Sequence, residues 1–292
     1  MKEECKKCNL KQVSSLSRLL DLDAQKENEL LEFANDYLAQ DFNDKTNPEV
    51  MGDLYARIIK SLCLDDPYET IKSEYNQFVM EQENAIDDII AFSDNEFETA
   101  LKIAIVGNLI DFSAKHRFSK EMLSEKIDRI VNSRLALDHS DLLFKRLGAA
   151  RSLLYLGDNC GEIVLDKIFI KKIKELFPQL QVTFACRGFP VVNDATMVDV
   201  KQVGLDQVCQ VIDNGDSSLG TVYHRVSPSF RQLFDEADII ISKGQGNLES
   251  LMADCPEKIF FLFMVKCELV GDPLGLEMYD IVCANLSRHL KK

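Results

Sequence analysis

Three short polar clusters in the second half of the chain carry side chains that could perform chemistry. They are residues 157–162, 187–196 and 242–249. Asp158, Asn159 and Asp194 offer carboxylate and amide oxygens, the ligands that hard divalent cations such as Mg²⁺ or Mn²⁺ prefer. Lys243, close to the start of an expected helix, suits a phosphate group. The clusters therefore predict a metal site that accepts a phosphorylated molecule.

Each of these residues also has a purely structural interpretation. Asp158 or Asp194 alone is more often a turn or helix-capping residue, and Lys243 alone is more often a solvated surface lysine. The glycines at positions 244 and 246 could form no more than a tight turn. The functional interpretation therefore depends on the three clusters meeting in space, which the surrounding elements must arrange.

Short apolar runs precede the clusters and are typical of buried strands. The predicted strands are 152–156, 181–185, 208–212, 238–241 and 259–263. Helical patterns fall between most of them, and this alternation predicts an α/β fold with a mainly parallel sheet covered on both faces. Ligands bind beyond the carboxyl ends of the strands in such sheets, so we expect the three clusters at one edge.

The first half of the chain shows helical periodicity instead. The predicted helices are 48–62, 68–92, 95–113 and 120–132, and no convincing strand precedes residue 150. Pro48 suits the first turn of its helix. We therefore predict a helical N-terminal subdomain over residues 1–149 and an α/β domain over residues 150–292, with the active site at their interface.

The bulk composition limits the classes of partner. The 292 residues are 46% apolar and 28% charged, with a formal net charge of −14. Such an acidic surface repels nucleic acid and anionic membranes, and an anionic substrate needs a local cation to bind. No apolar run reaches the ~20 residues that span a bilayer, and the polar start lacks a secretory leader. We therefore expect a cytoplasmic protein with no nucleic acid or membrane partner.

Nine cysteines are scattered along the chain, and we expect them to be free thiols. Cys5 and Cys8 form a Cys-x-x-Cys pair, but no second pair follows to complete a zinc site. The plain interpretation is two thiols near the start of a helix, and a structural metal is the alternative. The four histidines show no metal-ligand spacing.

The motifs resemble those of the DUF89 family, also called ARMT1-like, of metal-dependent damage-control phosphatases. The similarity runs along nearly the whole chain and is greatest to the stand-alone prokaryotic branch with an N-terminal Cys-x-x-Cys. The matching segments are residues 5–12, 66–76, 107–111, 158–163, 187–199 and 243–251. The sequence departs from the family at Cys160, where a small residue such as Ala is commoner, and after the pair Lys266 and Cys267.

The resemblance implies a three-layer α/β/α Rossmann-like sheet beside the helical subdomain. It implies hydrolysis of small phosphometabolites, such as sugar phosphates or damaged phosphorylated metabolites, with Mn²⁺, Mg²⁺, Co²⁺ or Ni²⁺ as cofactor. The implied metal ligands are Asp158, Asn159 and Asp194. Lys243 would contact the substrate phosphate, and Asn108 and Asp111 would reach the same pocket from the helical part.

Our mechanistic hypothesis is attack on the phosphate by a metal-activated water. Lys243 and the backbone N–H groups after Asp158 or Asn247 would balance charge on the phosphoryl oxygens, with Arg187 as a further substrate contact. The candidates to orient the water are Glu162, Asp111 and Glu249, and the sequence does not choose among them. Asp158 as a covalent nucleophile is the less favoured variant, because the metal would then keep too few ligands.

Two other classes of function stay open. An S-adenosylmethionine-dependent carboxyl methyltransferase is compatible with the α/β half, but no glycine-rich nucleotide loop follows the first predicted strand. A non-catalytic protein that binds a metal or a phosphorylated ligand is the second class. In the phosphatase hypothesis the partner is a small phosphorylated metabolite, and the sequence leaves a homo-oligomer open.

Overall fold

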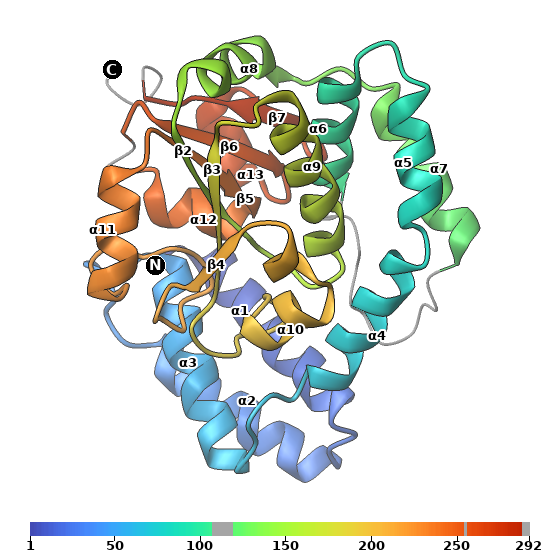
Figure 1. Ribbon diagram of the computed structural model, residues 1–292. Coiled ribbons are helices and arrows are strands. Elements are labelled where there is room, and N and C mark those ends of the chain that lie inside the picture. Colours follow the sequence, from blue (N-terminus) through green and yellow to red (C-terminus); the bar gives the residue numbers. More distant parts are fainter. Residues whose placement is uncertain (107–118, 254–255, 288–292) are drawn as a thin grey trace.

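A central seven-stranded sheet organises the computed structural model, which describes residues 1–106, 119–253 and 256–287. The strands lie in the order β1-β7-β6-β5-β2-β3-β4 (Figure 1). Their bounds are β1 (Leu137–Asp138), β2 (Ser152–Leu156), β3 (Gln181–Cys186), β4 (Gln210–Asp213), β5 (Ile239–Lys243), β6 (Ile259–Met264) and β7 (Ile281–Ala284). Neighbours from β6 to β4 pair in parallel, whereas β7 pairs antiparallel with β6 and parallel with β1.

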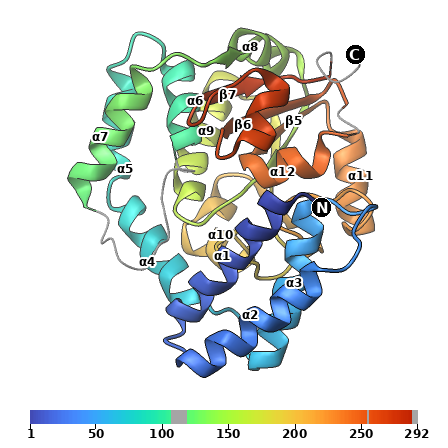
Figure 2. The ribbon, with the colours of Figure 1, turned by 180° about the vertical axis from the view of Figure 1, so that it is seen from behind.

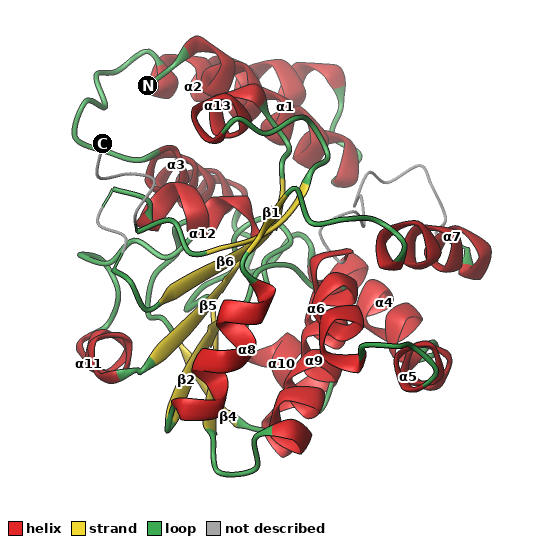
Figure 3. Ribbon diagram, turned by 90° about the horizontal axis from the view of Figure 1, so that it is seen from above, coloured by secondary structure: helices red, strands yellow, loops and turns green. Residues whose placement is uncertain are grey.

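Helices cover both faces of this sheet (Figure 3). Their bounds are α1 (Glu3–Leu19), α2 (Ala24–Leu38), α3 (Asn47–Leu62), α4 (Glu69–Met80), α5 (Glu83–Ala91), α6 (Glu96–Val106), α7 (Lys120–Val131), α8 (Ser140–Ala149), α9 (Glu162–Leu176), α10 (Met197–Gln202), α11 (Pro228–Glu236), α12 (Gly244–Leu251) and α13 (Glu268–Gly271). Helices α6 and α9 lie on one face, and α11 and α12 lie on the other. The predicted three-layer α/β arrangement is confirmed.

Strand β2 shows how the apolar runs fill the space between the layers. Leu153 and Tyr155 belong to the core that α6 and α9 cover, whereas Leu154 and Leu156 belong to the core on the opposite face. Successive side chains of a strand point to opposite faces, so a strand covered on both sides is apolar at every position. This is why β2 could be recognised from its sequence.

Helices α1, α2 and α3 build a smaller core at one end of the molecule, below the sheet in Figures 1 and 2. Helix α3 begins with a capping box between Thr46 and Glu49 and carries Pro48 in its first turn, as the sequence indicates. Val191 and Val192, from the loop after β3, pack into the same core. The small helical core is therefore attached directly to a loop that carries one of the polar clusters.

Several predicted elements need correction. Strand β1 lies in the half of the chain where no strand was expected, and β7, which lies between β1 and β6, was missed. Both strands are too short, at two and four residues, to show a clear pattern in the sequence. The predicted helix 68–92 is two helices, α4 and α5, and α12 begins at Gly244, whereas the sequence suggests a start near Asn247. The domain boundary at residues 149 and 150 stays a prediction, although β1 places part of the first half inside the sheet.

The described part of the chain contains no helix long and apolar enough to cross a bilayer. Its cysteines are all free thiols, as expected from their scatter along the sequence. The location of the protein in the cell stays a prediction.

Candidate active site

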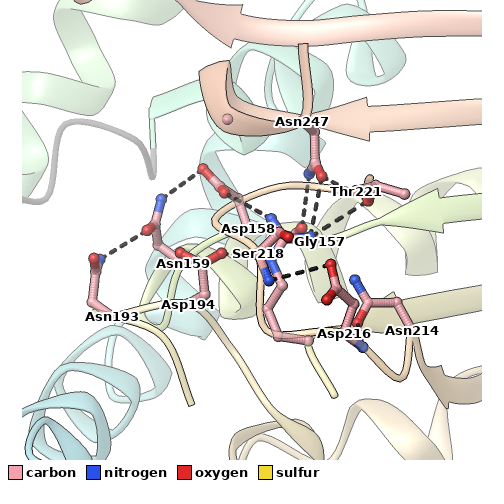
Figure 4. A network of polar contacts seen from close by, with 12 residues as sticks. Gly157, Asp158, Asn159, Asn193, Asp194, Asn214, Asp216, Ser218, Thr221 and Asn247 are labelled. Atoms are coloured by element: carbon pink, nitrogen blue, oxygen red, sulfur yellow. Dashed lines mark hydrogen bonds and ion pairs between the residues drawn. The ribbon is translucent and has the colours of Figure 1, made fainter. Parts of the chain in front are cut away.

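The turn after β2 and the loop after β3 pair through their backbones. The N–H of Ala195 donates to the carbonyl of Asp158 at 2.9 Å, and the N–H of Cys160 donates to the carbonyl of Asn193 at 3.0 Å. Asn159 and Asp194 form an isolated antiparallel bridge. Two polar clusters that are far apart in the sequence therefore meet at the carboxyl ends of neighbouring parallel strands, as predicted (Figure 4).

The side chains of these segments form a connected row of polar contacts. Asn159 Nδ2 donates to Asp158 Oδ2 at 2.8 Å, and Asn159 Oδ1 accepts from Asn193 Nδ2 at 2.8 Å. Asp194 Oδ2 accepts from Arg187 Nε at 2.6 Å, and another nitrogen of the same guanidinium lies 3.5 Å from Asp158 Oδ1. Figure 4 shows Asn193, Asn159 and Asp158 joined in this row with Asp194 close by. The three predicted metal ligands are thus neighbours.

The carboxylates of this cluster are short of positive charge. Burial and the nearby charges of Asp194 and Glu162 raise the pKa of Asp158 well above its usual value, although Arg187 and Lys266 oppose the shift. Burial likewise raises the pKa of Asp194. A cation bound here would favour the ionised carboxylates, so the donor set suits a hard divalent metal.

The candidate metal site combines two carboxylates with one amide, so it is not built from acidic or sulfur ligands alone. Within the described ranges, no group of three or more His, Cys, Asp or Glu side chains is arranged to hold a metal. The candidate set has two carboxylates and depends on the Asn159 amide as its third donor. Water would have to fill the remaining positions, which is usual for Mg²⁺.

A pocket of about 270 Å³ opens directly onto this cluster. Asp158, Asn159 and Asp194 all line it. Its other walls come mainly from α1, α3, α12 and the segment after β6, and include Cys5, Cys8, Gln12, Gln245, Glu249, Lys266 and Cys267. Lys266 is the only cationic side chain among the described residues that line the pocket. The Cys-x-x-Cys pair thus faces the candidate site instead of packing only as helix-start thiols.

The structure places Lys243 differently from the prediction. Its side chain is fully buried, and its Nζ donates to Glu162 Oε1 at 2.5 Å, Asp166 Oδ1 at 2.5 Å and the carbonyl of Ala104 at 2.7 Å. Burial alone would lower the pKa of Lys243, but the charges of Asp166 and Glu162 raise it above its usual value. An ammonium with three acceptors and no access to the pocket is poorly placed to contact a phosphate.

Two further predicted substrate contacts are also buried behind the pocket. Arg187 is 3% exposed, and besides the two carboxylates it bonds Asn247 Oδ1 at 3.1 Å. The Asn247 Nδ2 donates to the carbonyls of Gly157 and Lys243 at 3.1 and 2.7 Å. Neither side chain lines the pocket. In this structure Arg187 and Asn247 hold the site together and are not free to bind substrate.

The predicted residues that could orient a water fall into three groups. Glu162 is fully buried and bonded to Lys243, whereas Glu249 lines the pocket. Asp111 lies outside the described residues, as does the predicted substrate contact Asn108.

Sequence reasoning gave no role to Lys266, although a usable signal was present. Lys266 follows β6 as closely as the predicted clusters follow their strands, and its side chain is exposed. The carboxyl ends of parallel strands meet at one edge, so a lysine there was a candidate on the same grounds as Lys243.

Comparison with known proteins places this arrangement in a family. The sequence pattern of the damage-control phosphatase ARMT1-like domain matches residues 1–282. The chain belongs to the damage-control phosphatase ARMT1-like family. The match spans both the helical part and the α/β part, so the family resemblance seen in the motifs is confirmed. The narrower assignment to a branch with an N-terminal Cys-x-x-Cys stays a prediction.

Individual members of the family are similar to this chain over nearly their whole length. A damage-control phosphatase of Pyrococcus horikoshii is 35% identical over 282 residues, which cover 96% of each chain. A damage-control phosphatase of Archaeoglobus fulgidus is 28% identical over 281 residues, covering 95% of this chain and 96% of the relative. The crystal structure of a DUF89 family protein from Pyrococcus horikoshii superposes with a TM-score of 0.87 at 33% identity, covering 98% of both chains.

Proposed function

We propose that this chain is a metal-dependent phosphatase that hydrolyses small phosphorylated metabolites. The observation that carries the proposal is a pocket in which Asp158, Asn159 and Asp194 lie together and Lys266 supplies the cation. The 35% identity to a damage-control phosphatase supports the same reaction class. The volume of about 270 Å³ is close to the lower end of the range in which proteins bind small molecules, about 300–1,000 Å³.

Asp158, Asn159 and Asp194 would hold a divalent cation, with Mn²⁺, Mg²⁺, Co²⁺ and Ni²⁺ as the metals to test. The cation would supply positive charge at the phosphate and an activated water. Arg187 bonds Asp194 and approaches Asp158, which holds both carboxylates in place while leaving the pocket side open.

Lys266 takes the role that the sequence suggested for Lys243. Lys266 is exposed and lies on the pocket wall, and its positive charge lowers the pKa of Asp158, opposing the effect of burial. A cation at that position attracts an anionic phosphate into a protein whose net charge is −14. It would also balance charge that develops on the phosphoryl oxygens.

Glu249 is the pocket-facing carboxyl best suited to move a proton. Burial raises its pKa above the usual value, and Gln245 Nε2 fixes one of its oxygens at 2.8 Å. A carboxyl with a raised pKa is a better proton donor near neutral pH than an exposed one. We therefore favour Glu249 over Glu162 for proton transfer.

A metal-by-substrate screen tests the proposal. The purified chain, first treated with a chelator, is assayed for phosphate release from p-nitrophenyl phosphate and sugar phosphates with each metal in turn. We expect release only after metal addition, and we expect Asp194→Asn to abolish it while the protein stays folded. If no metal supports release and methyl groups pass from S-adenosylmethionine to a carboxyl, the methyltransferase alternative replaces this proposal.

A further inference from the structure

A row of buried polar side chains lies behind the candidate metal ligands. Lys243, Glu162 and Asp166 are each 0% exposed, and the Lys243 ammonium sits between the two carboxylates with 2.5 Å to each. Tyr155, on β2, donates its hydroxyl to Asp166 Oδ1 at 2.6 Å. None of these groups lines the pocket, so direct contact with a substrate does not explain why three charges are buried here.

Helix α9 brings the two carboxylates to one cation. Glu162 and Asp166 are four residues apart in α9, so they project from the same face of the helix. Lys243 is the last residue of β5, directly beside β2, and by the alternation of the strand its side chain points to the face that α9 covers, as do Ile239 and Ile241. Burying a charge without partners is costly, so separating Lys243 from its two carboxylates would be strongly unfavourable.

The row connects to the metal ligands through Glu162. One oxygen of Glu162 accepts from Lys243, and the other accepts from Asn159 Nδ2 at 3.1 Å. Asn159 Nδ2 is also held by Asp158 Oδ2 at 2.8 Å. The amide nitrogen therefore has two acceptors on one side, which leaves Oδ1 on the side of Asn193, a residue that lines the pocket.

This orientation decides whether Asn159 can serve as a ligand. An amide binds a hard cation through its oxygen, and its nitrogen can only donate hydrogen bonds. We propose that Asp166 and Lys243 are positioning residues, which hold the Glu162 carboxylate so that it turns the Asn159 amide oxygen toward the pocket. The inference rests on the proposed metal site and assigns these two residues no contact with the substrate.

The test measures Mn²⁺ affinity of the full chain by calorimetry, without turnover. Asp166→Asn keeps the shape of the side chain but removes one of the two charges that hold Lys243, so Lys243 is expected to pull Glu162 away from Asn159. Partners of this kind typically change metal affinity by roughly tenfold or more. We therefore expect Mn²⁺ to bind at least roughly tenfold more weakly to Asp166→Asn, and the d–d absorption of bound Co²⁺ to shift.

A matched control separates positioning from stability. Lys167 is next to Asp166 in α9 and is also buried, but it pairs with Glu83 at 2.5 Å, away from the metal ligands. Lys167→Met should lower the melting temperature and leave Mn²⁺ affinity within about twofold of the original chain. Equal loss of affinity in Lys167→Met and Asp166→Asn would show a general structural effect and overturn the proposal.

A milder variant covers the case in which Asp166→Asn does not fold. Tyr155→Phe removes only the hydroxyl that donates to Asp166 and keeps the ring packed against Phe184. We expect a smaller but measurable loss of Mn²⁺ affinity. Unchanged affinity in the folded Asp166→Asn, or in Tyr155→Phe where that alone folds, would overturn the positioning role. Absence of Mn²⁺ binding by the original chain would instead overturn the proposed metal site.

Discussion

Lys266 carries the positive charge that the pocket presents to an anionic ligand. A hydrogen bond between charged groups contributes about 1.5–3 kcal/mol. For Lys266→Gln we therefore predict a loss of roughly tenfold to a hundredfold in kcat/KM for phosphorylated substrates. Steady-state kinetics across a range of substrate concentrations measures the change.

The control for Lys266→Gln is Lys11→Gln, which makes the same change of charge on α1 at a residue that does not line the pocket. Its kinetics should match those of the original chain. A similar loss in both variants would mean that net charge, and not contact with the phosphate, governs binding.

Gly244 leaves room for the carboxylate of Asp158. Its φ is +76°, and a Cβ added there would lie 1.9 Å from Asp158 Oδ2. For Gly244→Ala we predict at least a roughly tenfold loss of metal affinity, because the methyl group must displace a proposed ligand. Calorimetric titration with Mn²⁺ measures the affinity.

Gly275 provides the comparison for Gly244. Its φ is +67°, but nothing lies within 4 Å of an added Cβ. Gly275→Ala therefore carries the same backbone strain, about 1–2 kcal/mol, without the clash. Metal affinity should be unchanged in this variant. An equal loss in both would assign the effect to strain alone.

The sequence correctly predicted that Lys243 lies at the end of a strand, but it did not predict the direction of the side chain. A lysine at a strand end can face the ligand edge or turn into the core, and residue type alone does not decide. The deciding partners are Glu162 and Asp166, two acidic residues on an otherwise apolar stretch of α9. Their four-residue spacing was visible in the sequence, but the cation between them became apparent only in the structure.

Among the helices, α4 supports the turn after β2 from behind. Its Asn76 Oδ1 accepts from the N–H of Gly161 at 2.6 Å. One turn earlier, Lys72 is 1% exposed and pairs with Asp66 at 2.7 Å and Asp199 at 3.0 Å. Asp66, Lys72 and Asn76 belong to the segment 66–76, whose resemblance to the family carried no physical reason in the sequence. The structure supplies one, because Asn76 holds the turn that carries the candidate ligands and Lys72 links α4 to Asp199 of α10.

For Lys72→Met we predict a loss of about 3 kcal/mol in the free energy of unfolding, because two largely buried carboxylates lose their shared cation. Urea unfolding followed by circular dichroism measures it. Lys45→Met is the control, since Lys45 pairs with Asp53 at 2.7 Å but is 41% exposed. Exposed pairs contribute at most about 1 kcal/mol. A loss no larger for Lys72→Met than for Lys45→Met would contradict the prediction.

Elements with a long apolar run were predictable, and short edge elements were not. Strand β6 was expected over residues 259–263 and spans Ile259–Met264. Strand β1 has two residues, too few to show a pattern, and exists because β7 offers it a backbone partner. Pairing partners are set by the whole fold, so such strands become visible only after the sheet has been assembled.

Across the whole molecule, the helical first half and the sheet share one core. Leu101 of α6 packs in the same cluster as Leu153 of β2. Ion pairs also cross between the two parts, with Lys172 of α9 lying 2.6 Å from Glu96 of α6. Separating the two parts would expose apolar surface on both.

We therefore predict a single unfolding transition for the whole chain. Far-UV circular dichroism and tyrosine fluorescence, which is usable because the chain has seven tyrosines and no tryptophan, should give the same urea midpoint. Two separated midpoints would instead support independent folding of residues 1–149.

The composition of the pocket wall ties its formation to the order of protein synthesis. Helix α1 supplies Cys5 and Cys8, and the segment after β6 supplies Lys266 and Cys267. These residues line the same pocket, but the ribosome adds the second pair long after the first. Closing so long a loop is entropically costly and slow. On the ribosome, the turn with Asp158 is therefore finished well before the pocket that surrounds it. By the positioning role proposed above, Asn159 is oriented only after Lys243 has been made, and the pocket wall is completed only by Lys266. The metal site and the substrate pocket therefore both form late in synthesis.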